Sequence, residues 1–343
     1  MVLLCCAVSL ASCSAEQNGA GDAAGEVAGE VADQTTEASA AGTGSTTSSA
    51  PEAAGDTAAS TSSTLGTAPT QGDSAEAARV ELPRGGTELF PRYRLFGYSG
   101  APDSTGLGRL GIGDLDERVV EMQERGEEYA GGREVMPVLE LIATIVHAVP
   151  GQDGMYRTHQ PDEVVQDYLE AARRHDGILL LNIQPGRADF LDEVKHWEDY
   201  LVEPDVGVAL DPEWAVEEGQ TPGRVYGRTT GDELDDVAAY LADLVAEHDL
   251  PEKVMVYHQV HKGVVRQESD LRPHESVVLI KSVDGIGGPG SKIETYDSVN
   301  ETTPKGVVAG FKLFYEEDAV LGPIMTGDEV LAMRPVPQYI LFE

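Results

Sequence analysis

Two carboxylates stand at the end of an apolar run in the segment VGVALDPEWAV, residues 206–216. Its small and β-branched residues predict a buried strand, and Pro212 ends that strand because proline has no N–H for the ladder. Since side chains alternate along a strand, we expect Asp211 and Glu213 to share one face, with Trp214 following at the rim. Such a carboxylate pair suits glycoside hydrolysis, in which one carboxyl is a general acid and the other a nucleophile, base or electrostatic partner.

Polar residues also occur within or just after the other apolar runs. Together with Trp214, we expect ten of them to bind substrate around the carboxylate pair: Glu140, Asn182, Gln184, Arg187, Tyr257, His258, Lys281, Asp284, Lys312 and Glu316. Buried charges are costly unless they are paired, so Glu140, Lys281 and Lys312 predict an ionic network. Alternatively, Glu140 is a purely structural partner of one of these lysines, and Glu316 belongs to a solvated acidic loop.

The elements that carry these residues begin at Thr87. Eight apolar runs predict strands at residues 94–100, 135–146, 177–184, 206–211, 253–260, 276–285, 307–318 and 337–343. Amphipathic segments between them predict helices, and Thr230 with Glu233 predicts a capping box. Eight strands alternating with helices predict an α/β fold, a (β/α)8 TIM barrel whose site lies at the carboxyl ends of its strands. A doubly wound open sheet is the alternative.

The chain before the barrel has two parts. Residues 1–13, MVLLCCAVSLASC, are too short to span a bilayer stably and are typical of a secretory signal. Residues 14–86 consist almost wholly of Ala, Gly, Ser, Thr, Glu and Asp, which predicts a disordered tether before the barrel domain at 87–343.

The signal ends in Leu-Ala-Ser-Cys, which resembles the lipobox of bacterial lipoproteins. This resemblance implies lipidation of Cys13 and an extracytoplasmic protein anchored to the outer face of the cytoplasmic membrane. An ordinary secretion signal is the alternative. The stretches FGYSG, LLLNIQPGRADF and GFKLFYEED are also similar to uncharacterised secreted lipoproteins of high-GC Gram-positive bacteria.

Charge and cysteine content exclude several classes of function. The chain has a net charge of −36, which disfavours nucleic acid and anionic membranes as partners, so we expect membrane contact only through the lipid on Cys13. All 3 cysteines lie in residues 1–13, so the barrel has no disulfide, Cys-ligated zinc or cysteine nucleophile. The segments GLGRLG and GIGGPG match a dinucleotide pattern but lack its strand-to-helix context, so we expect mobile loops and no cofactor.

The Asp-x-Glu ending of the fourth strand resembles that of chitinase-like glycoside hydrolases, which are (β/α)8 barrels. The resemblance covers this one motif. It implies that Glu213 is the general acid and that Asp211 orients the substrate's acetamido group. The chain departs from that family at Ala209, where a further Asp is usual, and at Pro212, between the two acids.

These observations predict a monomeric glycoside hydrolase-like barrel that acts on cell-wall or environmental glycans. Two alternatives stay open. One is a non-catalytic surface barrel that binds glycans. The other is a metal-dependent hydrolase that uses Asp211, Glu213, His258 and Asp284, although we expect no metal.

Overall fold

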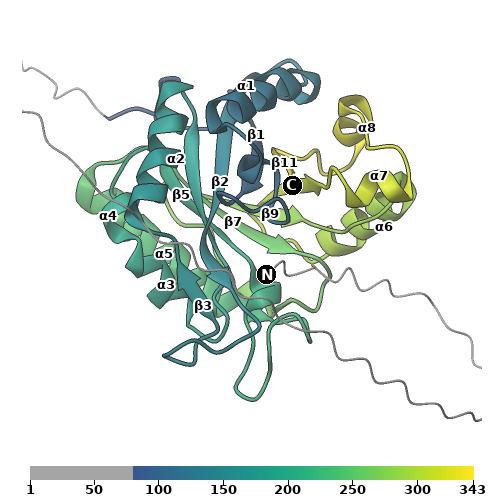
Figure 1. The fold of residues 1–343 in the computed structure, drawn as a ribbon. Helices are drawn as coiled ribbons and strands as arrows, with labels where there is room; N and C mark the ends of the chain where they lie inside the picture. Colours follow the sequence, from purple (N-terminus) through teal and green to yellow (C-terminus); the bar gives the residue numbers. More distant parts are fainter. Residues whose placement is uncertain (1–79) are drawn as a thin grey trace, which may run out of the picture. The chain divides into compact units, whose positions relative to one another are not determined.

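The computed structural model describes residues 80–343, which form a closed barrel of parallel strands (Figure 1). The strands are β1 (Tyr93–Gly100), β2 (Glu134–Val146), β4 (Ile178–Ile183), β5 (Val206–Leu210), β7 (Lys253–Gln259), β9 (Val277–Val283), β10 (Val308–Leu313) and β11 (Tyr339–Phe342). Each pairs in parallel with the next, and β11 pairs with β1. The predicted (β/α)8 barrel is therefore confirmed, and the open-sheet alternative is wrong.

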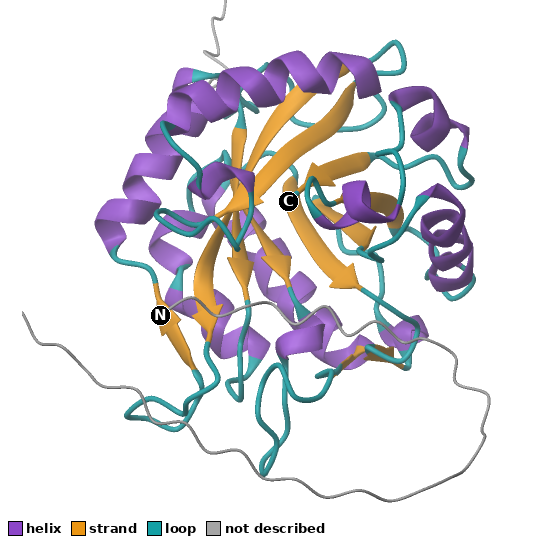
Figure 2. Ribbon diagram, turned by 45° about the vertical axis from the view of Figure 1, so that its right-hand side comes forward, coloured by secondary structure: helices purple, strands orange, loops and turns teal. Residues whose placement is uncertain are grey.

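The helices lie around the outside of this barrel (Figure 2). They are α1 (Leu115–Gly126), α2 (Asp162–Arg174), α3 (Phe190–His196), α4 (Glu198–Leu201), α5 (Gly231–His248), α6 (Pro289–Asn300), α7 (Glu317–Leu321) and α8 (Gly327–Ala332). The predicted capping box at the start of α5 is present, because Thr230 and Glu233 each bond the other's backbone N–H. None of the helices between residues 80 and 343 has both the length and the apolar character needed to cross a membrane.

Short elements extend the carboxyl end of the barrel. Strand β3 (Arg157–His159) pairs antiparallel with the end of β2, and β6 (Thr229–Thr230) pairs with β8 (Val265–Arg266). The loops after β2 and β5 reach beyond the strand ends at the lower edge of Figure 1. Substrate-binding groups of this fold come from such loops.

Strand alternation sorts the barrel residues into two apolar layers. Side chains such as Leu95, Val138 and Ala209 fill the interior, and a larger cluster packs between the barrel and its helices. On β9, Ile280 belongs to the interior layer, so its neighbour Lys281 points outward. Side chains therefore point alternately into the barrel and toward the helices, and only a polar residue at an inward-pointing position can reach the carboxyl end of the barrel interior, here called the barrel mouth.

The amino end of the barrel is closed by the segment that precedes β1. Leu82 and Leu89 belong to the interior layer and are 3% and 0% exposed. The Tyr93 hydroxyl donates to the backbone oxygens of Arg84 and Gly85, both at 2.7 Å. Packing therefore begins before Thr87, within the last residues of the predicted tether. The rest of that tether, the predicted signal peptide and Cys13 lie outside the described residues.

Candidate functional site

A fully buried histidine lies among carboxylates at the carboxyl end of the barrel. His258 Nδ1 lies 2.8 Å from Asp284 Oδ2, and Nε2 lies 3.0 Å from Glu140 Oε1 and 3.9 Å from Asp211 Oδ1. Burial lowers the pKa of His258, but these three carboxylates outweigh burial and raise the pKa well above its usual value. The imidazole therefore carries a positive charge at neutral pH.

Glu140 and Asp284 are both held in their ionised form. Tyr339 and Asn182 donate to the two oxygens of Glu140, at 2.8 and 3.0 Å. Burial raises the pKa of Glu140, but His258 and Lys312 hold it below its usual value. For Asp284, burial is likewise outweighed, by the same two cations and by hydrogen bonds, and the pKa falls to about 2.

Lys312 completes the buried network from β10. Its Nζ lies 3.4 Å from Asp284 Oδ2 and 2.6 Å from Glu343 Oε2. Burial lowers the pKa of Lys312, but the carboxylates around it raise the pKa well above its usual value. Ser282 also donates to Asp284, at 2.8 Å. Each cation of the network is thus shared by at least two carboxylates, which offsets the cost of desolvation.

The Asp211–Glu213 pair has a different character from these carboxylates. Strand β5 ends at Leu210, and a 3-10 turn, η3 (Pro212–Trp214), follows. The expectation that Asp211 and Glu213 share a strand face is therefore wrong, because Pro212 starts a turn rather than continuing the pleat. The charges of Asp211 and Asp284 nevertheless act on the Glu213 carboxyl.

Both members of the pair hold their protons more tightly than usual. Burial raises the pKa of Asp211 to about 6, because His258 and Lys312 compensate it only in part. Burial, followed by the negative charges of Asp211 and Asp284, raises the pKa of Glu213 to about 8. At neutral pH Glu213 is therefore mostly protonated and Asp211 mostly ionised, which is the division of roles that acid catalysis requires.

Several buried polar atoms at this end have no hydrogen-bond partner among residues 80–343. They include two donors, His258 Nε2 and Arg187 Nε, and three oxygen atoms, Asp211 Oδ1, Glu213 Oε2 and Asn182 Oδ1. The residues Asp211 and Asn182 are only 4% and 2% exposed, whereas Glu213 as a whole is half-buried. Because an unpaired buried polar atom is costly, these three oxygen atoms mark where a ligand would contact the protein.

Three other predicted residues lie in the segments that follow β4 and β5. Gln184 donates to Asp211 Oδ2 at 3.3 Å. Arg187 donates to the backbone oxygen of Gln220 at 2.6 Å and stacks on Tyr156, so it joins the loops after β2, β4 and β5. Trp214 is half-buried, next to Glu213 in η3.

Tyr257, Lys281 and Glu316 lie away from the barrel mouth. The Tyr257 hydroxyl and Lys281 Nζ both contact Glu268 outside the barrel wall, at 2.7 and 2.8 Å. Glu316 is exposed at the start of α7. The predicted ionic network thus contains Glu140 and Lys312 but not Lys281, because strand parity turns Lys281 toward the helices.

Sequence reasoning missed Ser282, Tyr339 and Glu343. A signal for Ser282 was present, since it lies two residues before Asp284 and must share its face. Tyr339 shares its strand face with Leu341, both in the interior layer. Its contact with Glu140 depends on closure of the barrel, and that of Glu343 with Lys312 depends on the pairing of β10 with β11.

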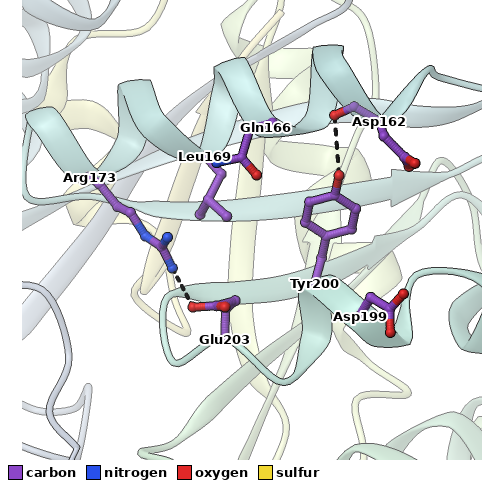
Figure 3. Close-up of a pocket in the computed structure, with 7 residues that line it drawn as sticks. All are labelled: Asp162, Gln166, Leu169, Arg173, Asp199, Tyr200 and Glu203. Carbon is purple, nitrogen blue, oxygen red and sulfur yellow. Dashed lines mark hydrogen bonds and ion pairs between the residues drawn. The ribbon is translucent and has the colours of Figure 1, made fainter.

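Two cavities lie away from the barrel mouth. One of about 360 Å3 borders α2 and α4 and is lined by Asp162, Gln166, Leu169, Arg173, Asp199, Tyr200 and Glu203 (Figure 3). Its polar groups bond one another, for example Arg173 with Glu203 at 2.6 Å. The other, of about 400 Å3, is lined by Lys262, Val265, Gln267, Glu268, Ser269 and Thr302. Neither has an unpaired buried side-chain atom in its lining.

The metal-dependent alternative lacks a ligand set in the described part of the chain. Between residues 80 and 343, no three His, Cys, Asp or Glu side chains are arranged to hold a metal ion. A metal ion would also have to bind a deprotonated nitrogen of His258, whereas both ring nitrogens face carboxylates and carry protons.

No protein-family model matches the chain, and comparison with curated proteins finds no significant relative. The functional argument therefore depends on the geometry of the barrel mouth.

Proposed function

We propose that this barrel is a glycoside hydrolase with Glu213 as the general acid and Asp211 as its ionised partner. The observation that carries the proposal is the state of Glu213. Its Oε2 is buried without a partner, and its pKa is raised to about 8 beside ionised carboxylates. A carboxylic acid that stays protonated at neutral pH can give its proton to a leaving glycosidic oxygen.

The neighbouring residues support this role. Cleavage of a glycosidic bond places positive charge on the sugar ring, and the Asp211 carboxylate is available to stabilise that charge through its free Oδ1. The network of His258, Glu140, Asp284 and Lys312 fixes the charges around the pair. A rigid, dry arrangement strengthens such electrostatic effects because little reorganisation is needed during the reaction.

The test measures release of reducing ends from a panel of polysaccharides. We expect Glu213→Gln to abolish hydrolysis, because glutamine cannot supply the proton. The matched control is Glu217→Gln, the same substitution on the same loop at a side chain that is 62% exposed. Full activity of Glu213→Gln would remove Glu213 from the mechanism. Saturable sugar binding by the wild type without turnover would favour a glycan-binding barrel.

We also propose that the protein is exported and anchored through a lipid on Cys13. The lipobox-like sequence supports this proposal. Cys13→Ala should move the protein from the membrane fraction to the soluble fraction, and an unchanged distribution would contradict the anchor.

A further inference from the structure

We propose that the barrel mouth selects glycans with a free amino group, that is, amino sugars whose nitrogen is a protonated ammonium. N-acetylated, neutral and acidic sugars would bind more weakly. This inference deepens the proposed function, since it names the substrate class of the same site.

Carboxylates outnumber cations at the mouth. The acidic side chains are Glu140, Asp211, Glu213, Asp284 and Glu343, and the cations that contact them there are His258 and Lys312. Even with Glu213 protonated, ionised carboxylates exceed cations at neutral pH. The local field therefore favours a positively charged ligand.

Both cations at the mouth are already neutralised. Lys312 contacts Asp284 and Glu343, and His258 contacts Asp284 and Glu140. A uronate or sulfated sugar would have to take one of these cations from its carboxylates. Breaking a buried ion pair in this way leaves a buried carboxylate without its cation, so acidic glycans are disfavoured.

Two buried oxygens of the mouth are free acceptors, whereas His258 Nε2 is a buried donor without an aligned hydrogen bond. Asp211 Oδ1 and Asn182 Oδ1 are buried and have no hydrogen-bond partner within residues 80–343. An ammonium group offers three donors and a charge, which suits a buried carboxylate oxygen and an amide oxygen better than a neutral group does. The amide oxygen of an acetamido group carries no charge, so beside His258 Nε2 it would compete with the Glu140 carboxylate, which lies 3.0 Å from that nitrogen.

The whole chain favours the same kind of ligand at longer range. Its net charge of −36 attracts a polycationic chain and repels a polyanionic one. This attraction is screened by salt, whereas a buried contact with Asp211 is screened much less. Salt dependence therefore separates general attraction from recognition at the mouth.

The test uses calorimetry on the full chain carrying Glu213→Gln, so that turnover does not complicate binding. The probes are oligomers of glucosamine and of galactosamine, their N-acetylated counterparts, a glucose oligomer and a uronate oligomer. At a pH near 6 and moderate salt, we expect at least one amine oligomer to bind about tenfold tighter than its acetylated counterpart. Adding Asp211→Asn should remove that preference, since a lost contact of about 1.4 kcal/mol corresponds to tenfold in affinity. Adding Glu217→Gln should leave it unchanged.

Equal or tighter binding of the acetylated oligomers would overturn the inference. So would an amine preference that survives Asp211→Asn and disappears in salt, because surface charge would then explain it. The two proposals fail separately. Turnover of acetylated or neutral glycans without amine preference would refute the amine selectivity and keep the hydrolase. Amine-selective binding without turnover of any glycan by the wild type would keep the amine selectivity and refute the hydrolase.

Discussion

The Nδ1 atom of His258 and the Oδ2 atom of Asp284 lie 2.8 Å apart and join the carboxyl ends of neighbouring strands β7 and β9. Both side chains are buried, so neither can turn to water if the other is removed. His258 is also the positive charge closest to Glu140. One imidazole therefore keeps two buried carboxylates ionised.

Replacing His258 by Asn should lower the free energy of unfolding by about 3–5 kcal/mol, because Glu140 and Asp284 lose their shared cation inside the barrel. Urea denaturation monitored by circular dichroism measures this change. The control is His248→Asn at the exposed end of α5, which should change stability by less than about 0.5 kcal/mol. A similar, small effect of both substitutions would show that the ion pair does not support the fold.

Hydrolysis should show a bell-shaped dependence on pH. Asp211 must be ionised, so kcat/KM should fall as pH drops below about 6. Glu213 must be protonated, so the same quantity should fall as pH rises above about 8. Initial rates across this range give both limbs, which belong to the coupled pair rather than to single residues. Any residual activity of Glu213→Gln should lack the alkaline limb, and its persistence would assign that limb to another group.

Glu213→Gln should stabilise the protein in alkaline solution. The folded-state pKa of Glu213, about 8, lies above its usual value of 4.5, so the folded protein binds this proton more tightly. The resulting stability is complete below about pH 4.5 and is lost as pH rises through 8. Gln mimics the protonated form at every pH. The Tm values of the wild type and of Glu213→Gln, measured by calorimetry, should therefore agree in acid, and the variant should have the higher Tm at alkaline pH. A variant with a lower Tm at every pH would show that ionisation of Glu213 does not destabilise the folded protein.

Two buried lysines should differ in their effect on catalysis. Lys312→Met removes a charge beside Asp284 and should lower kcat, whereas Lys281→Met breaks contacts with Glu268, Val299 and Thr302 outside the barrel wall. Both substitutions should reduce stability. Activity per folded molecule, with the folded fraction taken from denaturation curves, separates the two effects. A loss of kcat in Lys281→Met at full folding would return Lys281 to the site.

The sequence was sufficient for the barrel and for part of its mouth. Apolar runs bounded by Gly, Pro and Asp located all eight strands, and Pro212 correctly marked the end of β5. Lys281 was misplaced because it lies three residues before Asp284, and side chains three positions apart on a strand point to opposite faces. Glu213 was assigned to a strand face because the pleat was extended through a proline.

Contacts between strands required the structure. His258 lies opposite Ser282 because β7 and β9 pair in one register, and neither strand's own residues identify which residue of the other strand will face them. Tyr339 meets Glu140 only because the barrel closes. Such contacts decide the pKa of each carboxyl group. From the sequence, Glu213 could therefore be proposed as the general acid only through the resemblance to chitinase-like glycoside hydrolases.

Leu82 and Leu89 close the amino end of the barrel interior, so the two ends of the barrel differ. The described chain enters the fold there, at the end of the barrel opposite Asp211 and Glu213. Attaching the barrel to a bead or a surface directly through Val80 would therefore leave the opposite end of the barrel accessible to long polymers. A fusion partner added at the same end would likewise obstruct no approach to it.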